Sequence, residues 1–201
     1  MWLIKIGGSW VKNPKILDLI KALGKYKSSE DLILVCGGGC FADSVRSVYS
    51  VTKMSEETGN FIALKATELF SYLLKEIEDD FFLTSEINDF RKKRIKIWLP
   101  SKVLNKNKTF IENWDSTSDS VAAWLHNKIS SKGLIFIKSL ELKEKKYNIN
   151  DLQKKEILDR NVNKYIFEKK NIKIIGPDII SLLNKSLDWD EFFLKLKEIE
   201  F

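Results

Sequence analysis

The stretch Trp2-Leu3-Ile4-Lys5-Ile6-Gly7-Gly8-Ser9 decides the fold, because a short apolar segment ends there at two glycines. The pattern returns at 32–35, an apolar segment that is soon followed by Gly37-Gly38-Gly39. Short, continuous apolar runs are typical of strands buried on both faces of a parallel sheet. Three further short segments, at 95–98, 134–137 and 172–175, are also expected to be strands. The sequence therefore predicts a mainly parallel sheet in which several strands end in glycine turns.

Amphipathic helices are expected between these strands. Asn13 and Pro14 mark a helix start, as capping residue and first helical residue. The second part of a long helical region carries apolar residues along one side: Ile62, Ala66, Leu69, Leu73 and Ile77. The polar segment 143–155 is expected to be a surface excursion, and 190–201 a helix. Repeated strand, glycine turn and helix predict an α/β fold with helices on both faces of the sheet, in one domain spanning residues 1–201.

Composition narrows the possible partners. The formal net charge is +6, but the lysines are spread along the chain and only four arginines occur. We therefore expect no nucleic acid partner, and interpret the basic run 91–94 as a solvated helix end. No apolar run approaches the length of a membrane span, and the first residues do not form a secretory signal. A cytoplasmic protein without a membrane partner is expected.

Metal-ligating residue types are scarce. The chain has two cysteines, Cys36 and Cys40, and one histidine, His126. The spacing of these residues matches no metal-site pattern, so no protein-held metal is expected. We interpret the cysteines as reduced thiols and His126 as a surface residue.

Three charged residues stand where a parallel sheet gathers its ligands, at the carboxyl ends of strands. Lys5 precedes the first glycine pair, Lys138 ends a later apolar run, and Asp119 falls in the first turn of a helix expected from Thr117. Two ammonium groups held by a carboxylate can stabilise the charge on a transferred phosphoryl group. Each residue alone has a simpler interpretation, as a solvated lysine or as a partner of the helix dipole. Their order along the chain favours one joint phosphoryl-transfer site.

This ordered set resembles the amino acid kinase superfamily, which includes carbamate kinase, acetylglutamate kinase, uridylate kinase and isopentenyl phosphate kinase. The resemblance rests on the Lys5–Ser9 stretch, the Gly37-Gly38-Gly39 triplet, the 118–123 helix start and the strand that ends at Lys138. It implies a three-layer α/β/α sandwich, like that of carbamate kinase, which binds ATP and Mg²⁺.

The resemblance also implies roles for the residues at the strand ends. Lys5 would stabilise the transferred phosphoryl group, Lys138 would contact the nucleotide phosphates, and Asp119 would organise both lysines. Gly8 and Gly38 would lie against the phosphates of donor and acceptor. The remaining expected contacts are Gly7, Ser9 and Ser139 on the nucleotide side, and Gly37, Gly39 and Ser118 on the acceptor side.

A narrower resemblance is carried by the segments 37–46, 97–101 and 114–125. They are similar to the small kinases of methanofuran-type cofactor biosynthesis, which phosphorylate [5-(aminomethyl)furan-3-yl]methyl phosphate to its diphosphate. One departure concerns the donor. Many superfamily members follow the second lysine with Thr-Asp and a glycine-containing loop, whereas here Lys138 precedes Ser139-Leu140-Glu141-Leu142. The preferred nucleoside triphosphate is therefore left open.

The acceptor is expected to be a small phosphate monoester. Isopentenyl phosphate kinases place a histidine after the triple glycine, whereas this chain has Asp43 there. Asp43 suits a cationic aminomethyl group, and Arg46, three residues later on a helix, suits a phosphate. Both residues have plainer interpretations, as a partner of the helix dipole and as a surface arginine. Trp98, Trp114 and Trp124 either wall a furan ring or belong to the core.

Two alternatives remain open. The first is the same fold acting on a carboxylate, a carbamate, a nucleotide or isopentenyl phosphate. The second is a non-catalytic protein of this fold that binds oxyanions. A homo-oligomer is expected in either case.

Overall fold

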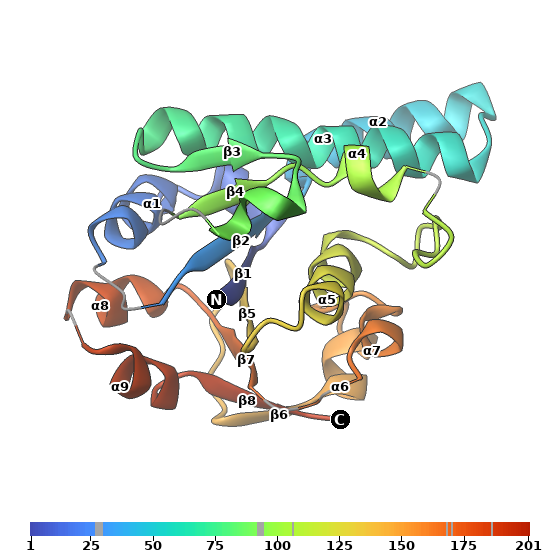
Figure 1. Cartoon of the computed structure of the whole chain (residues 1–201). Coiled ribbons are helices and arrows are strands. Elements are labelled where there is room, and N and C mark those ends of the chain that lie inside the picture. The colour runs from blue at the N-terminus through green and yellow to red at the C-terminus, as the bar shows by residue number, and fades with distance from the viewer. Residues whose placement is uncertain (27–29, 92–94, 106, 168, 170, 186) are drawn as a thin grey trace.

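Within the described residues, eight strands form one sheet in the order β3-β4-β2-β1-β5-β7-β8-β6. Figure 1 shows this computed structural model, which describes residues 1–26, 30–91, 95–105, 107–167, 169, 171–185 and 187–201. Neighbouring strands pair in parallel except β7 and β8, which are antiparallel. The strands are β1 Trp2–Ile6, β2 Leu32–Cys36, β3 Phe82–Thr84, β4 Lys96–Trp98, β5 Leu134–Ile137, β6 Lys146–Asn148, β7 Ile172–Ile175 and β8 Lys197–Glu200. The predicted, mainly parallel sheet is confirmed.

Helices connect these strands. The α-helices are α1 Ile16–Lys25, α2 Gly39–Thr52, α3 Glu56–Ile77, α4 Ser101–Leu104, α5 Ser118–Lys128, α6 Ile149–Lys154, α7 Val162–Tyr165, α8 Ile179–Asn184 and α9 Trp189–Leu194, and the 3₁₀ helices are η1 Gly8–Lys12 and η2 Ile87–Arg91. None of the helices in the described part of the chain is long and apolar enough to cross a membrane.

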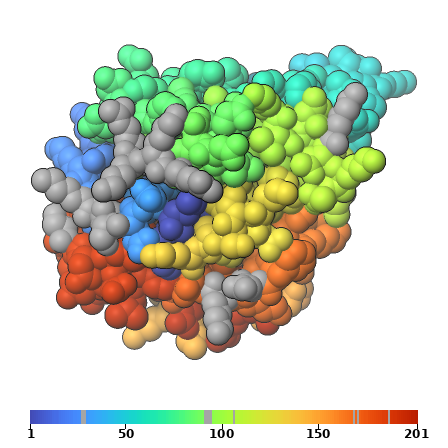
Figure 2. Space-filling model, in the orientation of Figure 1, coloured from blue at the N-terminus to red at the C-terminus, as the bar shows by residue number. Residues whose placement is uncertain are grey.

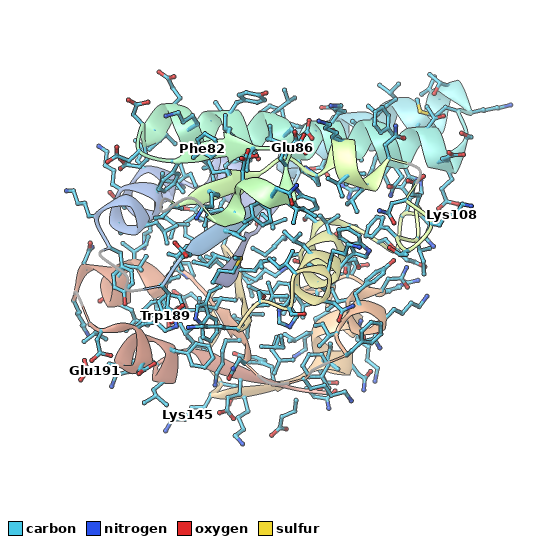
Figure 3. The ribbon with its side chains drawn as sticks, viewed as in Figure 1. Phe82, Glu86, Lys108, Lys145, Trp189 and Glu191 are labelled. Carbon is cyan, nitrogen blue, oxygen red and sulfur yellow. The ribbon has the colours of Figure 1, made fainter. Side chains whose placement is uncertain are left out.

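The helices form two layers around the sheet. Helices α5, α6 and α7 lie on one side, and α1, α8 and α9 on the other (Figure 1). Successive residues of a strand point to opposite faces, so Leu3 of β1 packs in the cluster beneath α5 while Ile4 packs in the cluster beneath α1. Trp189 of α9, labelled in Figure 3, packs in the second cluster. The predicted three-layer α/β/α sandwich is confirmed.

The strand register brings the expected site residues to one edge. Ile6 of β1 lies opposite Cys36 of β2 on one side and Ile137 of β5 on the other. The next residues, Gly7, Gly37 and Lys138, therefore leave the sheet side by side. Main-chain hydrogen bonds continue the ladder there, since the N–H of Gly7 donates to the carbonyl of Ile137 at 2.8 Å.

The predicted apolar side of α3 is wrong in part, since Ala66 on that side is buried but its two leucines are not. Leu69 and Leu73 are 51% and 45% exposed, whereas Leu64, Phe70 and Leu74 are buried. Apolar residues occur on several sides of this helix, so spacing alone could not select the side that meets the sheet. Helix α3 pairs with α2, and Figure 2 shows that the turn between them projects at one corner of the molecule.

Three further expectations about local structure need correction. Helix α1 begins at Ile16, and Asn13 instead accepts a hydrogen bond from the Lys15 N–H in the preceding turn. The polar segment 143–155 contains β6 and α6, and the segment 190–201 ends in β8 rather than continuing as a helix. Both short strands carry charged residues on the exposed side, which hides them from a search for apolar runs. Of the basic run 91–94, residues 92–94 lie outside the described residues.

Candidate active site

A carboxylate joins two buried lysines at the carboxyl edge of the sheet. Asp119 stands in the first turn of α5, Lys5 on β1 and Lys138 directly after β5. The Nζ atom of Lys5 lies 2.7 Å from Oδ1 of Asp119, and Nζ of Lys138 lies 2.9 Å from both carboxylate oxygens. All three residues are at most 7% exposed. The three residues that the sequence placed in one site therefore lie together.

The charged groups of the triad formed by Lys5, Asp119 and Lys138 shift one another's pKa values. Burial alone would raise the pKa of Asp119, but the ammonium groups of Lys138 and Lys5 outweigh it and lower that pKa to about 2. Burial lowers the pKa of Lys138 to about 8; Asp119 opposes this shift and Lys5 adds to it. Asp119 is thus an anion throughout the neutral pH range. Lys138 is a cation at neutral pH and begins to lose its proton just above pH 7.

Asp159 holds the start of α5 in place. One of its carboxylate oxygens accepts hydrogen bonds from the main-chain N–H groups of Thr117 and Ser120, at 2.7 and 3.0 Å, and from the Thr117 hydroxyl. The other accepts from the Ser120 hydroxyl at 2.8 Å. Burial, followed by the nearby charge of Asp119, raises the pKa of Asp159. A carboxylate distant in sequence thereby caps the helix that carries Asp119, a role that the sequence analysis missed.

The glycine turns after β1 and β2 pack against each other, backbone to backbone. A Cβ atom on Gly37 would lie 2.2 Å from the main-chain nitrogen of Gly8, and one on Gly8 would lie 2.2 Å from that of Gly39. Gly39 also has a φ of +51°, in the left-handed region that favours glycine. These glycines are needed to bring the two turns together. That they also approach phosphates remains a prediction.

The residues expected on the nucleotide side come from two neighbouring strand ends. The hydroxyl oxygens of Ser9 and Ser139 lie 2.6 Å apart and share a hydrogen bond. Gly7, two residues before Ser9, donates its N–H to the carbonyl of Ile137 at the end of β5. The structure therefore brings Gly7, Ser9 and Ser139 together beside Lys138.

A cavity of about 500 Å³ opens next to the triad. Its wall includes most of the predicted site residues: Lys5, Gly8, Ser9, Gly38, Gly39, Asp43, Arg46 and Ser118. Asp119 and Lys138 line an adjoining cavity of about 600 Å³, and Arg46, Trp114 and Thr117 border both. The wall of the first cavity also contains polar residues that the sequence analysis did not select, among them Lys12, Asn60, Thr67 and Ser116. Nothing in their spacing distinguishes them from surface residues.

Asp43 and Arg46 pair with each other at the cavity wall. The Nη1 atom of Arg46 lies 2.7 Å from Oδ1 of Asp43, and its guanidinium carbon lies 5.8 Å from the centre of the Trp114 ring. The side chains of Asp43 and Arg46 are 69% and 47% exposed. Both are placed to meet a ligand, and their predicted contacts remain predictions.

The structure shows where the three tryptophans and the histidine named in the sequence analysis lie. Trp98 and Trp124 stack on each other in the core, with ring centres 6.3 Å apart, so only Trp114 of the three borders the cavity. His126 was expected at the surface, but it is buried, and its Nδ1 shares a hydrogen bond with the Ser131 hydroxyl. The turn after α5 folds back over the ring, which a helical pattern could not indicate.

Comparison with known proteins shows the family of this chain. Residues 1–186 match the model of the amino acid kinase family, and the chain belongs to that family. It is 32% identical over 133 residues to the [5-(aminomethyl)furan-3-yl]methyl phosphate kinase of Methanocaldococcus jannaschii. That match covers 62% of this chain and 59% of that protein, less than two thirds of the relative's length.

Solved structures share the fold at low identity. Uridylate kinase from Archaeoglobus fulgidus superposes with a TM-score of 0.67 and 18% identity, covering 91% of this chain and 95% of that one. UMP kinase from Ureaplasma parvum superposes with a TM-score of 0.63 and 14% identity, covering 98% of this chain and 97% of that one. Aspartate kinase from Synechocystis superposes with a TM-score of 0.62 and 10% identity, covering 88% of this chain and 38% of that one. These likenesses show the fold alone.

Proposed function

We propose that this chain is an ATP-dependent kinase that phosphorylates a small phosphate monoester, with [5-(aminomethyl)furan-3-yl]methyl phosphate as the acceptor. The observation that carries the proposal is the contact of one buried carboxylate, Asp119, with two buried ammonium groups next to a cavity of about 500 Å³. That volume lies in the usual range for small-molecule sites. The 32% identity to a kinase named for this acceptor supports the choice of substrate.

In the proposed reaction, an oxygen of the acceptor phosphate attacks the γ-phosphorus of ATP. The bond from that phosphorus to the bridging oxygen breaks, ADP leaves, and the acceptor becomes a diphosphate. Lys5 neutralises the transferred phosphoryl group and Lys138 the nucleotide phosphates, since charge on these oxygens must be balanced in the transition state. Asp119 fixes both ammonium groups before the substrates arrive and is itself not a proton acceptor, because its pKa is about 2.

The residues present suit ATP and its Mg²⁺. Buried ammonium groups, the N-terminal turn of α5 and two adjoining cavities offer positive charge and room for a polyphosphate. In the described part of the chain, no group of three His, Cys, Asp or Glu residues could hold a metal ion. We therefore assign Mg²⁺ to the nucleotide phosphates, where it would neutralise charge between them, and to no protein cage.

The acceptor is assigned to the first cavity. Its cationic residues, Lys5, Lys12 and Arg46, suit a phosphate, and Asp43 suits an ammonium group. Trp114 offers an aromatic face beside them. The single domain over 1–201, the homo-oligomer and the cytoplasmic location remain predictions.

An acceptor screen tests the proposal. ADP release by the purified chain would be measured with ATP and a panel that contains the aminomethylfuran monoester, isopentenyl phosphate, UMP, a carboxylate and carbamate. We expect acceptor-dependent ADP release with the aminomethylfuran monoester, abolished in Lys5→Ala. Release with a carboxylate or carbamate alone would replace the proposed acceptor class, and release with UMP or isopentenyl phosphate alone would replace the proposed acceptor within that class. No release with any acceptor would favour the non-catalytic alternative.

A further inference from the structure

One polar side chain in the wall of the acceptor cavity is only half satisfied. Asn60 lies on α3, is 4% exposed and lines the cavity of about 500 Å³. Its Nδ2 group donates to the main-chain carbonyl of Asn113 at 3.0 Å. Among the described residues, its Oδ1 atom is buried and has no hydrogen-bond partner. Because a carbonyl can only accept, the bond to Asn113 fixes which end of the amide is oxygen.

A buried acceptor without a partner is costly, so its persistence calls for an explanation. Asn60 is held firmly on its other side. The side-chain oxygen of Asn113 accepts from Asn161, which also donates to the Ser116 hydroxyl. This chain of amides ties α3 to the segment that carries Trp114, whose indole Nε1 is also buried without a partner within the described part of the chain. Thus two residues that line the same cavity each carry a buried polar atom without a partner among the described residues, one an acceptor and the other a donor.

The charges around the cavity indicate which ligand group meets Asn60. The cationic side chains of Lys5, Lys12 and Arg46 attract the phosphate of the ligand. The amide oxygen of Asn60 can only accept a hydrogen bond, so it requires a donor group on the ligand. An ammonium group carries donors and no acceptor, and the carboxylate of Asp43 in the same wall adds attraction for positive charge. An amine at the end of the acceptor remote from its phosphate therefore fits this part of the wall.

We infer that Oδ1 of Asn60 accepts a hydrogen bond from the ammonium group of the substrate that is phosphorylated. Asn60 is then the residue that determines specificity for an amine on that substrate. The inference rests on the proposed function, because it assigns one end of the proposed acceptor. Oδ1 is almost closed off in the present conformation. Binding therefore includes a small turn of the amide or of Trp114 toward the cavity, as is common when a site tightens around its ligand.

Two probes and two variants test the inference. The probes are [5-(aminomethyl)furan-3-yl]methyl phosphate and (5-methylfuran-3-yl)methyl phosphate, which lacks only the amine. Asn60→Leu removes the acceptor atom at similar volume, together with the Nδ2 donor to Asn113, whose loss affects both probes alike. Ser71→Ala is the control for loss of a buried polar group on this helix. Ser71 is buried on the same helix, donates to the Thr67 carbonyl and does not line the cavity. kcat/KM for each probe and the Kd of the amine-bearing probe by calorimetry would be measured.

We expect Asn60→Leu to lower kcat/KM for the amine-bearing probe about ten- to a hundredfold, with a matching rise in its Kd, because a hydrogen bond to a charged group is lost. For the methyl probe we expect less than about a threefold change, which also shows that the variant is folded. Ser71→Ala should leave the ratio between the probes unchanged.

The outcomes separate the inference from the proposed function. Equal losses with both probes, or an unchanged ratio between them, would overturn the role of Asn60 while leaving a phosphate-monoester kinase. If the variant unfolds, Asn60→Asp retains acceptor oxygens and is compared in the same way: a retained preference for the amine supports the inference, and a lost preference overturns it. Failure of the wild type to use either probe would instead contradict the proposed function.

Discussion

Replacing Asp119 by asparagine is the most informative perturbation of the triad. Asp119→Asn keeps the shape of the side chain but removes the anion that lies within 2.9 Å of both ammonium groups. Lys5 and Lys138 would then be two neighbouring buried cations. Leaving a buried charge uncompensated costs about 3–5 kcal/mol. Lys138 can limit that cost by losing its proton, since its pKa is already lowered to about 8 and falls further when Asp119 no longer opposes the shift.

We therefore expect a folded variant that is less stable by about 3 kcal/mol. Lys138 loses its charge near neutral pH, so phosphoryl transfer falls by at least about 10²–10³. Single-turnover transfer, calorimetric ATP binding and thermal denaturation would be measured from pH 6 to 9. Part of the lost rate should return as the pH is lowered, because Lys138 regains its proton. A purely structural aspartate would produce no such recovery.

Asp151→Asn provides the matched control. Asp151 also lies in the first turn of a helix, α6, but it is exposed. We expect no change in rate and only a small change in stability for this variant, since an exposed first-turn carboxylate contributes about 0.3–1 kcal/mol. If Asp119→Asn turned over ATP like the wild type, or lost activity equally at every pH, the account of the triad would be refuted.

The same geometry makes five further predictions. Turnover should fall as the pH rises above about 8, where Lys138 loses its proton, and pH–rate profiles should show this limb moved upward in Lys138→Arg. Protein stability should not fall over that range on account of Lys138, because its folded pKa lies below 10.5 and the unfolded chain binds more protons between the two values; denaturation at pH 8 and 10 checks this. Asp159→Asn should cost about 1.5–3 kcal/mol in urea denaturation and lower kcat more than ATP affinity, because the start of α5 loosens. Asp43→Asn should raise KM for the amine-bearing acceptor by less than about fivefold, since the carboxylate is exposed and paired with Arg46. Gly37→Ala should destabilise the fold and abolish turnover, which melting curves and ADP release would report, because the added methyl would lie 2.2 Å from a main-chain nitrogen.

The sequence predicted the sheet and the triad because each leaves a local mark. Apolar runs that end in glycine indicate buried parallel strands, and parallel strands place their carboxyl ends at one edge. Lys5 and Lys138 could therefore be assigned to one site although they lie 133 positions apart in the sequence. The residue types Lys and Asp alone then predicted two ammonium groups held by one carboxylate.

Features that depend on packing left no such mark. Asp159 lies in a segment without apolar periodicity, and only the folded chain brings it to the start of α5. The exposed side of α3 could not be chosen, because Leu69 and Phe70 are equally apolar and only contact with the sheet distinguishes them. Asn60 looked like any helical asparagine until its oxygen proved to be buried beside a cavity.

The central claim is phosphoryl transfer to a phosphate monoester by the Lys5–Asp119–Lys138 site. Phosphorus NMR of the purified chain with ATP, Mg²⁺ and [5-(aminomethyl)furan-3-yl]methyl phosphate tests it most directly, because a new P–O–P bond couples two phosphorus resonances. The account predicts that the monoester resonance is replaced by a pair of coupled doublets as an equal amount of ADP forms, and that Asp119→Asn slows this at neutral pH. Formation of ADP and free phosphate with the monoester intact would contradict it.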